Sequence, residues 1–202
     1  MKNYSLKFLA TLVMLNLLLG CGNSQKNSDK TSNIDITSNQ TLTKKPDMIS
    51  QKITPCIWVE TNDAKAVADY YLSIFKDGKL KEHHQYTNPP EAGGGNFETA
   101  IVEIAGMELS ILAAGPFFKF NESVSFVINC KDQAEVDYYW AALTANGGEE
   151  SSCGWCKDKY KLSWQVVPVE YFDLINSKDP KVKEKAMQNT LKQKKIILSE
   201  LK

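Results

Sequence analysis

The 202-residue chain contains no arginine, so all 24 of its cationic side chains are lysines. Lysine lacks the planar guanidinium fork that grips phosphate or carboxylate with two parallel hydrogen bonds. Aspartate and glutamate together also number 24, and the formal net charge is therefore zero. A neutral chain without arginine lacks the basic surface that is typical of nucleic-acid-binding proteins. These absences argue against nucleic acid as the main partner.

A long apolar run is absent as well. The most apolar stretch, Phe8 to Leu19, has twelve residues, whereas a helix needs about 20 to cross a bilayer. Because Lys2 and Lys7 precede it, this stretch predicts a signal peptide over residues 1–20. The peptide ends in Leu18-Leu19-Gly20-Cys21, which resembles the lipobox of bacterial lipoproteins, where the cysteine sulfur receives a diacylglyceryl group.

Lipidation of Cys21 would anchor the chain to a membrane of the bacterial cell envelope. The alternative is an ordinary secretory signal in which the cysteine is incidental. Residues 21–49 are mostly Asn, Ser, Thr, Asp and Lys, and such a segment buries too little apolar surface to offset the entropy lost on folding. We therefore expect a disordered lipid tether there, followed by a folded domain over residues 50–202.

The domain begins with a strand, a helix and three more strands. Alternating apolar residues predict a strand over 53–59, and Asn62-Asp63 then supplies a helix N-cap. Apolar residues at spacings of three and four predict a helix that ends at Lys76-Asp77-Gly78. Further strands are expected over 79–87, 97–104 and 107–113, with Ala105-Gly106 as a tight hairpin turn.

The second half repeats this order. A strand is expected over 123–130, a helix after the N-cap Asp132, and strands over 149–152, 155–160 and 162–168. The tripeptide Asp137-Tyr138-Tyr139 follows Asp69-Tyr70-Tyr71 at an offset of 68 residues, although two amphipathic helices could share it by chance. The repeat predicts an α+β fold in which two βαβββ modules form a curved mixed sheet around a cleft. This core covers about residues 53–168, and C-terminal helices follow over 169–202.

Several blocks of sequence resemble the PhnB-like branch of the glyoxalase, or vicinal oxygen chelate, superfamily. They are Gly115-Pro116-Phe117-Phe118-Lys119-Phe120, Ser123 to Cys130, Asp137 to Trp140, Cys153-Gly154-Trp155 and Ser163 to Pro168. The resemblance implies the glyoxalase fold, a homodimer and, in most members, a divalent metal in the cleft. Members often carry the label demethylubiquinone methyltransferase. No glycine-rich loop follows a strand and opens a helix in this chain, so we do not expect methyltransferase activity.

Residues able to hold a metal are few. The two histidines, His83 and His84, are adjacent on an expected strand, so their side chains point to opposite faces. The family block usually has histidine where this chain has Phe117, and Gln165 and Glu108 remain as oxygen donors. A lone amide and a lone carboxylate hold a transition metal weakly. We therefore expect no strong metal site, with the histidines as solvated strand residues.

Cysteine offers a different chemistry. Cys153 and Cys156 have the C-x-x-C spacing of dithiol oxidoreductases, and a cell-envelope compartment permits disulfides. A redox dithiol normally lies at a helix N-terminus, where the helix dipole lowers the thiol pKa, whereas this pair lies between strands. The pair could be catalytic, could form a structural or incidental disulfide, or could remain two packed thiols.

Aromatic residues on the strands suggest a pocket. They include Trp58, Phe117, Trp155 and Trp164, and Ser125 and Gln165 are the polar residues expected beside them. A pocket with apolar walls and few polar groups suits a small, planar or hydrophobic ligand. The alternative is that these aromatics only form the core. We take Trp58, Phe117, Ser125, Trp155 and Gln165 as the candidate ligand site.

No Ser-His-Asp, Cys-His or paired-carboxylate arrangement can be assembled by spacing, and catalytic residues therefore stay unassigned. Three functions remain open. The first is a lipid-anchored protein that binds a small, largely apolar ligand without a strong metal site. The second is a metal-dependent enzyme of the glyoxalase or dioxygenase type, and the third is a thiol-redox lipoprotein.

Overall fold

The computed structural model describes residues 51–87 and 95–202. The predicted signal peptide (1–20), the predicted tether (21–49) and the lipidation site Cys21 all lie outside the described residues. Within the described ranges, no helix combines the length and the apolar character needed to cross a bilayer.

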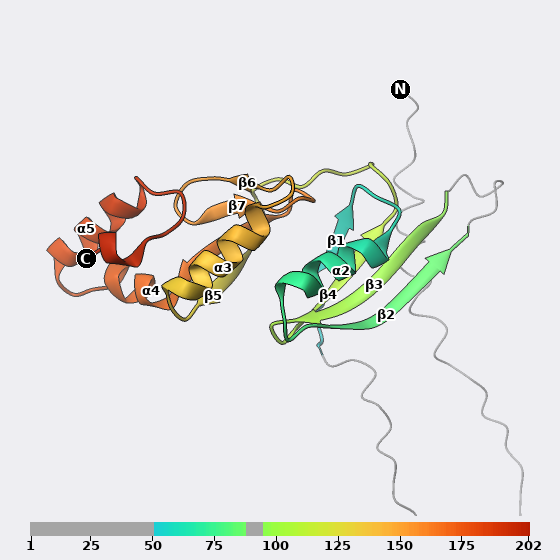
Figure 1. Ribbon diagram of the computed structural model, residues 1–202, viewed down its shortest axis with the longest axis horizontal. Helices are drawn as coiled ribbons and strands as arrows, with labels where there is room; N and C mark the ends of the chain where they lie inside the picture. Colours follow the sequence, from blue (N-terminus) through green and yellow to red (C-terminus); the bar gives the residue numbers. More distant parts are fainter. Residues whose placement is uncertain (1–50, 88–94) are drawn as a thin grey trace, which may run out of the picture. The chain divides into compact units, whose positions relative to one another are not determined.

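The first module has the predicted order of one strand, one helix and three strands (Figure 1). Its elements are β1 (Cys56–Val59), α2 (Ala64–Ile74), β2 (Lys79–Tyr86), β3 (Phe97–Ile104) and β4 (Met107–Ala113). Asp63 caps α2 as predicted, because its carboxylate accepts a 2.8 Å hydrogen bond from the Ala66 amide. Ala105 and Gly106 form the predicted hairpin turn with φ values of 48° and 77°, as a type I′ turn requires.

The second module repeats the order. It comprises β5 (Ser125–Cys130), α3 (Gln133–Thr144), β6 (Glu149–Glu150), β7 (Trp155–Lys157) and β8 (Ser163–Pro168). Asp132 caps α3 through a 2.9 Å bond from the Glu135 amide. Gly148 follows the end of this helix so closely that an added Cβ would lie 2.1 Å from the Leu143 carbonyl oxygen, which explains why glycine stands there.

Each module forms its own four-stranded mixed sheet. The strand orders are β1-β4-β3-β2 and β5-β8-β7-β6, and in both the first and last strands of the module pair in parallel. Helix α2 packs on the first sheet and α3 on the second (Figure 1). The predicted α+β fold of two βαβββ modules is therefore confirmed, with the strands divided between two sheets.

The internal repeat has an offset of 69 residues, one more than the shared tripeptide indicated. The two helix caps, Asp63 and Asp132, are 69 positions apart. At the same offset Tyr71 corresponds to Trp140, and both side chains are buried. The pairs Val67 with Val136 and Ile74 with Leu143 keep this register and are also buried. The repeat is real, but its buried positions define its register and the Asp-Tyr-Tyr match does not.

Strand β7 ends at Lys157, earlier than the predicted end at Tyr160. The cause is the side chain of Asp158, whose Oδ1 atom accepts the backbone amides of Tyr160 at 2.8 Å and Leu162 at 3.1 Å. These bonds fold the chain into a turn, in which Lys161 has a φ of 71°. A side chain that accepts hydrogen bonds from nearby backbone amides competes with the neighbouring strand for those amides.

The same carboxylate joins the two modules. Its Oδ2 atom accepts the Tyr71 hydroxyl of α2 and the Trp164 Nε1–H of β8, each at 2.9 Å. Asp158 and Tyr71 are fully buried. Burial raises the pKa of Asp158, while the four donors oppose this rise by stabilising the charged form. Burial also raises the pKa of Tyr71, so its hydroxyl keeps the proton that it donates.

The expected C-terminal helices are two α-helices and one 3₁₀ turn. They are α4 (Val169–Ile175), α5 (Pro180–Thr190) and η3 (Leu198–Glu200). After α5 the chain runs beside the turn that precedes β7. There the carbonyls of Gln193 and Lys194 accept the amides of Cys153 at 2.8 Å and Gly154 at 2.7 Å. Ile196 and Leu201 then pack with Val167 in a small second core.

Candidate functional site

Three of the predicted site residues share one face of the second sheet. On β8, Trp164 and Val166 are buried in the main core, so Gln165, which lies between them, points to the other side. We call this side the open face. Trp155 of β7 pairs with Gln165 in the ladder, and Ser125 of β5 pairs with Ser163. Paired residues point to the same side of a sheet, which places Ser125, Trp155, Ser163 and Gln165 together.

The polar side chains of this face differ in whether they have a hydrogen-bond partner. Gln165 donates a 2.9 Å hydrogen bond from Nε2 to the Ser125 hydroxyl oxygen, so these two side chains meet as expected. Ser163 is only 1% exposed, and its hydroxyl has no hydrogen-bond partner in the described part of the chain. A buried polar atom without a partner costs about 1–3 kcal/mol. The hydrogen-bonding capacity of the Ser163 hydroxyl is therefore unused within the described residues.

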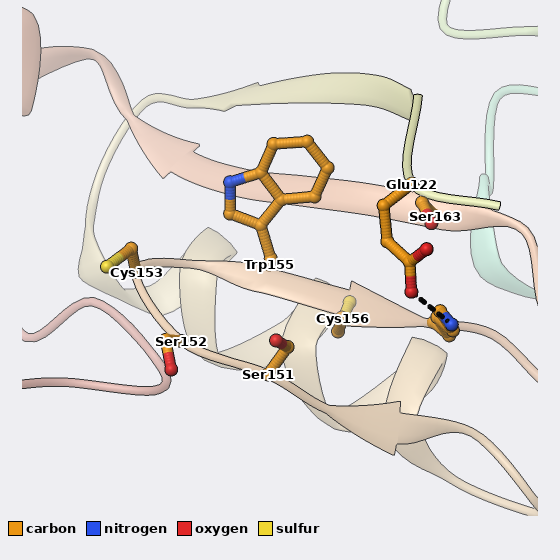
Figure 2. Close-up of a pocket in the computed structure, with 8 residues that line it drawn as sticks. Glu122, Ser151, Ser152, Cys153, Trp155, Cys156 and Ser163 are labelled. Atoms are coloured by element: carbon orange, nitrogen blue, oxygen red, sulfur yellow. Dashed lines mark ion pairs between the residues drawn. The ribbon is translucent and has the colours of Figure 1, made fainter. Parts of the chain in front are cut away.

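A pocket of about 320 Å³ opens beside these residues (Figure 2). Trp155 and Ser163 line it together with Glu122, Ser151, Ser152, Cys153, Cys156 and Lys157. Glu122, labelled in Figure 2, forms an ion pair with Lys157 at 2.5 Å. Ligand pockets typically begin at about 300 Å³, so this one is large enough for a small molecule.

The other two predicted site residues lie in the first module and in the segment that follows it. Trp58 of β1 donates a 2.8 Å hydrogen bond from Nε1 to the Gly115 carbonyl. Its ring meets Phe117 edge-on at 6.2 Å and Phe118 at 5.0 Å between centroids. Phe117 is 69% exposed. Among described residues no hydrogen bond or ring contact joins this cluster to Trp155, so the predicted site is divided between two places.

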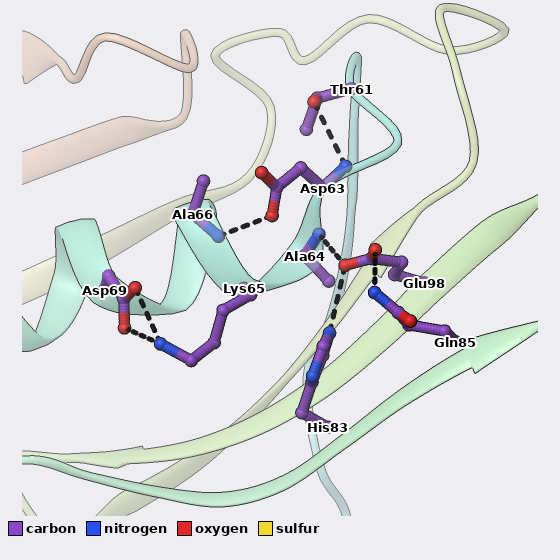
Figure 3. A network of polar contacts seen from close by, with 9 residues as sticks. All are labelled: Thr61, Asp63, Ala64, Lys65, Ala66, Asp69, His83, Gln85 and Glu98. Carbon is purple, nitrogen blue, oxygen red and sulfur yellow. Dashed lines mark hydrogen bonds and ion pairs between the residues drawn. The ribbon is translucent and has the colours of Figure 1, made fainter.

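A polar network lies at the start of α2 (Figure 3). The carboxylate of Glu98 accepts the Ala64 amide at 3.1 Å and lies 3.0 Å from His83 Nε2, while its second oxygen accepts Gln85 Nε2 at 2.8 Å. A carboxylate can only accept, so Nε2 of His83 carries the proton. The hydrogen bond from His83 holds the pKa of Glu98 below its ordinary value, and Gln85 adds to this effect. The sequence alone did not point to Glu98.

Comparison with known proteins identifies the family of this chain. The family model described as 3-demethylubiquinone-9 3-methyltransferase matches residues 51–167, more than half of the chain. The chain belongs to this family. Because its fold consists of the paired modules described above, it is a PhnB-like member of the glyoxalase superfamily, as the sequence blocks predicted.

Three bacterial proteins are among the solved structures that match this chain. A putative 3-demethylubiquinone-9 3-methyltransferase, PhnB protein, from Bacillus cereus is 24% identical, covers 58% of this chain and 99% of its own, and gives a TM-score of 0.51. Protein PA1353 from Pseudomonas aeruginosa is 17% identical over 59% of this chain and 98% of its own, with a TM-score of 0.48. A FosX fosfomycin resistance protein from Listeria monocytogenes is 14% identical over 59% of this chain and 91% of its own, with a TM-score of 0.38. Curated protein sequences give no match.

Many glyoxalase-superfamily proteins use a metal, and the His, Glu and Gln donors predicted for one lie apart in the described part of this PhnB-like chain. His83 pairs with Ala100 and His84 with Thr99 in the ladder, so the two rings point to opposite faces as predicted. Each already has a partner, Glu98 at 3.0 Å and Glu82 at 3.4 Å. Glu108 pairs with Lys81, and Gln165 bonds to Ser125. Across residues 51–87 and 95–202, no three His, Cys, Asp or Glu side chains lie close enough to share an ion.

The C-x-x-C pair also lacks the setting of a redox dithiol. Cys153 and Cys156 are free thiols, and Figure 2 shows Cys153 in the turn before β7 and Cys156 on the strand, with their sulfur atoms apart. Cys156 is buried in the main core, and burial raises the pKa of its thiol to about 12. Since the thiolate is the reactive form, a thiol with this pKa is inert at neutral pH.

We predict that Glu98 stabilises the fold above its own pKa and not below it. Its folded-state pKa is depressed, so the contribution is complete above the unfolded value of about 4.3 and is lost as the pH falls through the folded value. Glu98→Gln should lower the unfolding free energy by about 1.5–3 kcal/mol at about pH 6, and the difference should shrink toward about pH 3. Urea unfolding at both pH values measures it.

Glu82→Gln is the matched control, because Glu82 is 55% exposed and lies 3.4 Å from His84. This variant should change stability little at either pH. An equal loss for Glu98→Gln at both pH values would show that its charge contributes nothing.

Proposed function

We propose that this PhnB-like protein binds a small, planar, largely apolar molecule on the open face of its second sheet, without a metal. The observation that carries the proposal is the hydroxyl of Ser163, which is buried, unpartnered within the described residues and part of the pocket lining. Buried hydroxyls in native proteins normally have a partner. A ligand with one polar group would supply it.

The walls of the pocket define the chemical class of this ligand. Trp155 is half-buried and presents an indole ring to the pocket, and indole favours flat partners that stack on its face or meet its edge. Gln165 and Ser125 hold each other in place beside it. This arrangement supports a ring system of limited size that carries a hydroxyl, carbonyl or amine group.

The methyl transfer in the family's name needs a donor site that the strand-to-helix turns of the two described modules do not supply. A nucleotide-like donor is typically held by a glycine-rich turn between a strand and a helix. Here the turns are Glu60–Asp63 between β1 and α2 and Lys131–Asp132 between β5 and α3, and neither contains glycine. The geometry supports binding better than it supports that reaction.

We predict that Ser163→Ala weakens binding without weakening the fold. The variant removes an unpartnered buried hydroxyl, so the unfolding free energy should stay equal or rise. Titration calorimetry with 2-naphthol, a flat probe with one hydroxyl, should give a dissociation constant a few-fold to about tenfold higher than that of the wild type. Gln165→Ala should have an effect of similar size, and Trp155→Ala a larger one.

Phe172→Ala is the control, because Phe172 is an exposed aromatic residue of α4, outside the pocket. It should leave the affinity for 2-naphthol unchanged. If the wild type binds no 2-naphthol, and Trp155→Ala loses about 3–5 kcal/mol of stability as a core residue does, the binding proposal is wrong.

We also propose that the protein is lipid-anchored in the cell envelope through Cys21, on the basis of Leu18-Leu19-Gly20-Cys21. A diacylglyceryl group supplies the two acyl chains that stable anchoring needs. Cys21→Ser should leave the full chain unprocessed or soluble when a bacterial host is fractionated. A lipid-modified Cys21→Ser protein in the membrane pellet would overturn this proposal.

A further inference from the structure

We propose that a second pocket, lined by four lysines and sharing only Lys157 with the Trp155 pocket, binds a small organic dianion such as a phosphate ester or a dicarboxylate. We call it the lysine pocket. Its volume is about 490 Å³. The ammonium groups come from Lys119, Lys157, Lys159 and Lys161. Nothing in the proposed function of the Trp155 pocket requires this second site.

The lining comes from four separate parts of the chain, one of which is Glu149 of β6. Thr61 lies just after β1, Lys119 belongs to the segment that connects the modules, and Lys159 to Lys161 form the turn after β7. Asp158 holds that turn in place through its bonds to the amides of Tyr160 and Leu162. The positions of Lys159 and Lys161 therefore rest on a buried carboxylate.

Two of the lysines have no carboxylate partner among described residues. The ammonium group of Lys159 lies over two aromatic rings, 4.5 Å from the centroid of Tyr70 and 4.9 Å from that of Tyr160. Such contacts restrain a cation without neutralising it. Lys119 forms no ion pair with any residue that the structure describes. Both charges are available to a ligand.

The other two lysines are partly compensated. Lys157 pairs with Glu122 at 2.5 Å, and Lys161 pairs with Glu149 at 2.7 Å. Glu60 and Glu149 are the acidic residues of the lining, and with Glu122, the partner of Lys157, three carboxylates accompany the four lysines. A lining with this excess in a chain of zero net charge favours an anion.

The chemistry of lysine points to a compact dianion. An ammonium group is a point charge that can approach an oxygen from any direction. Lysines from two segments of the chain therefore suit an anion whose oxygens point several ways. The ring of Tyr160 adds an apolar wall for the organic part of the ligand. A ligand that bridges the connecting segment and the turn after β7 would also link the two modules.

The test is titration calorimetry of the protein, processed in its host, with inorganic phosphate, phenyl phosphate and succinate at low salt. We expect saturable binding of at least one of these probes, weakened by salt. Lys119→Gln and Lys159→Gln should each raise the dissociation constant about tenfold. Glu60→Gln should lower it, because it removes a negative charge from the lining. Lys178→Gln, an exposed lysine outside the pocket, should change nothing.

Opposite effects of Lys119→Gln and Glu60→Gln separate a specific site from a loss of folding, since a folding defect would weaken binding in both. Lys119 is exposed, and its side chain has no ion pair or hydrogen bond with a described residue, so its variant should unfold at the wild-type temperature. The proposal is overturned if none of the three probes binds saturably. It is equally overturned if Lys178→Gln weakens binding as much as Lys119→Gln, because binding would then follow overall charge. Trp155→Ala should leave phosphate binding unchanged, so this site and the Trp155 site can fail independently.

Discussion

The buried carboxylate of Asp158 organises this molecule. Its four hydrogen-bond donors come from a helix of the first module, a strand of the second and two amides of its own turn. A buried charge is expensive unless it is paired or fully hydrogen-bonded, so these groups must all be in position at once. Asp158 thus ties α2 to the second sheet and at the same time ends β7.

Both candidate binding places depend on this arrangement. Because β7 stops at Lys157, the next residues turn away and form one wall of the lysine pocket. The same short strand presents Trp155 on the open face, with Cys156 buried on the other side. The C-terminal extension supports the turn before β7 through the carbonyls of Gln193 and Lys194. This extension lies beyond the residues matched by the family model, which end at 167.

Local signals predicted the fold well, and long-range contacts account for what they missed. The caps at Asp63 and Asp132 and the Ala105-Gly106 turn are set by neighbouring residues, so they could be read from the sequence. The end of β7 depends on a carboxylate bonded to Tyr71, 87 residues away, and no periodicity reveals such a bond. The Asp-Tyr-Tyr match placed the repeat one residue out of register because Tyr71 is buried where the second module has Trp140.

The candidate site was also predicted where strand patterning determines it and missed where long-range packing does. Ser125 and Gln165 meet because ladder register follows from strand patterning, and Trp155 shares their face for the same reason. Trp58 and Phe117 were grouped with them because the two modules were expected to form one curved sheet around a cleft, whereas each module has a sheet of its own. Ser163 was missed because an unpartnered hydroxyl is a property of packing. Glu98 was missed because its three donors come from two elements that only the fold brings together.

A double-mutant cycle on Tyr71 and Asp158 tests the central claim, that this contact couples the modules. Urea unfolding of Tyr71→Phe, Asp158→Ala and the double variant gives the interaction energy directly. We expect Asp158→Ala to cost about 3–5 kcal/mol, with a coupling energy of about 1.5–3 kcal/mol between the two sites, as for hydrogen bonds to a charged group. A coupling energy near zero would show that the modules are held together by other contacts and would contradict this account.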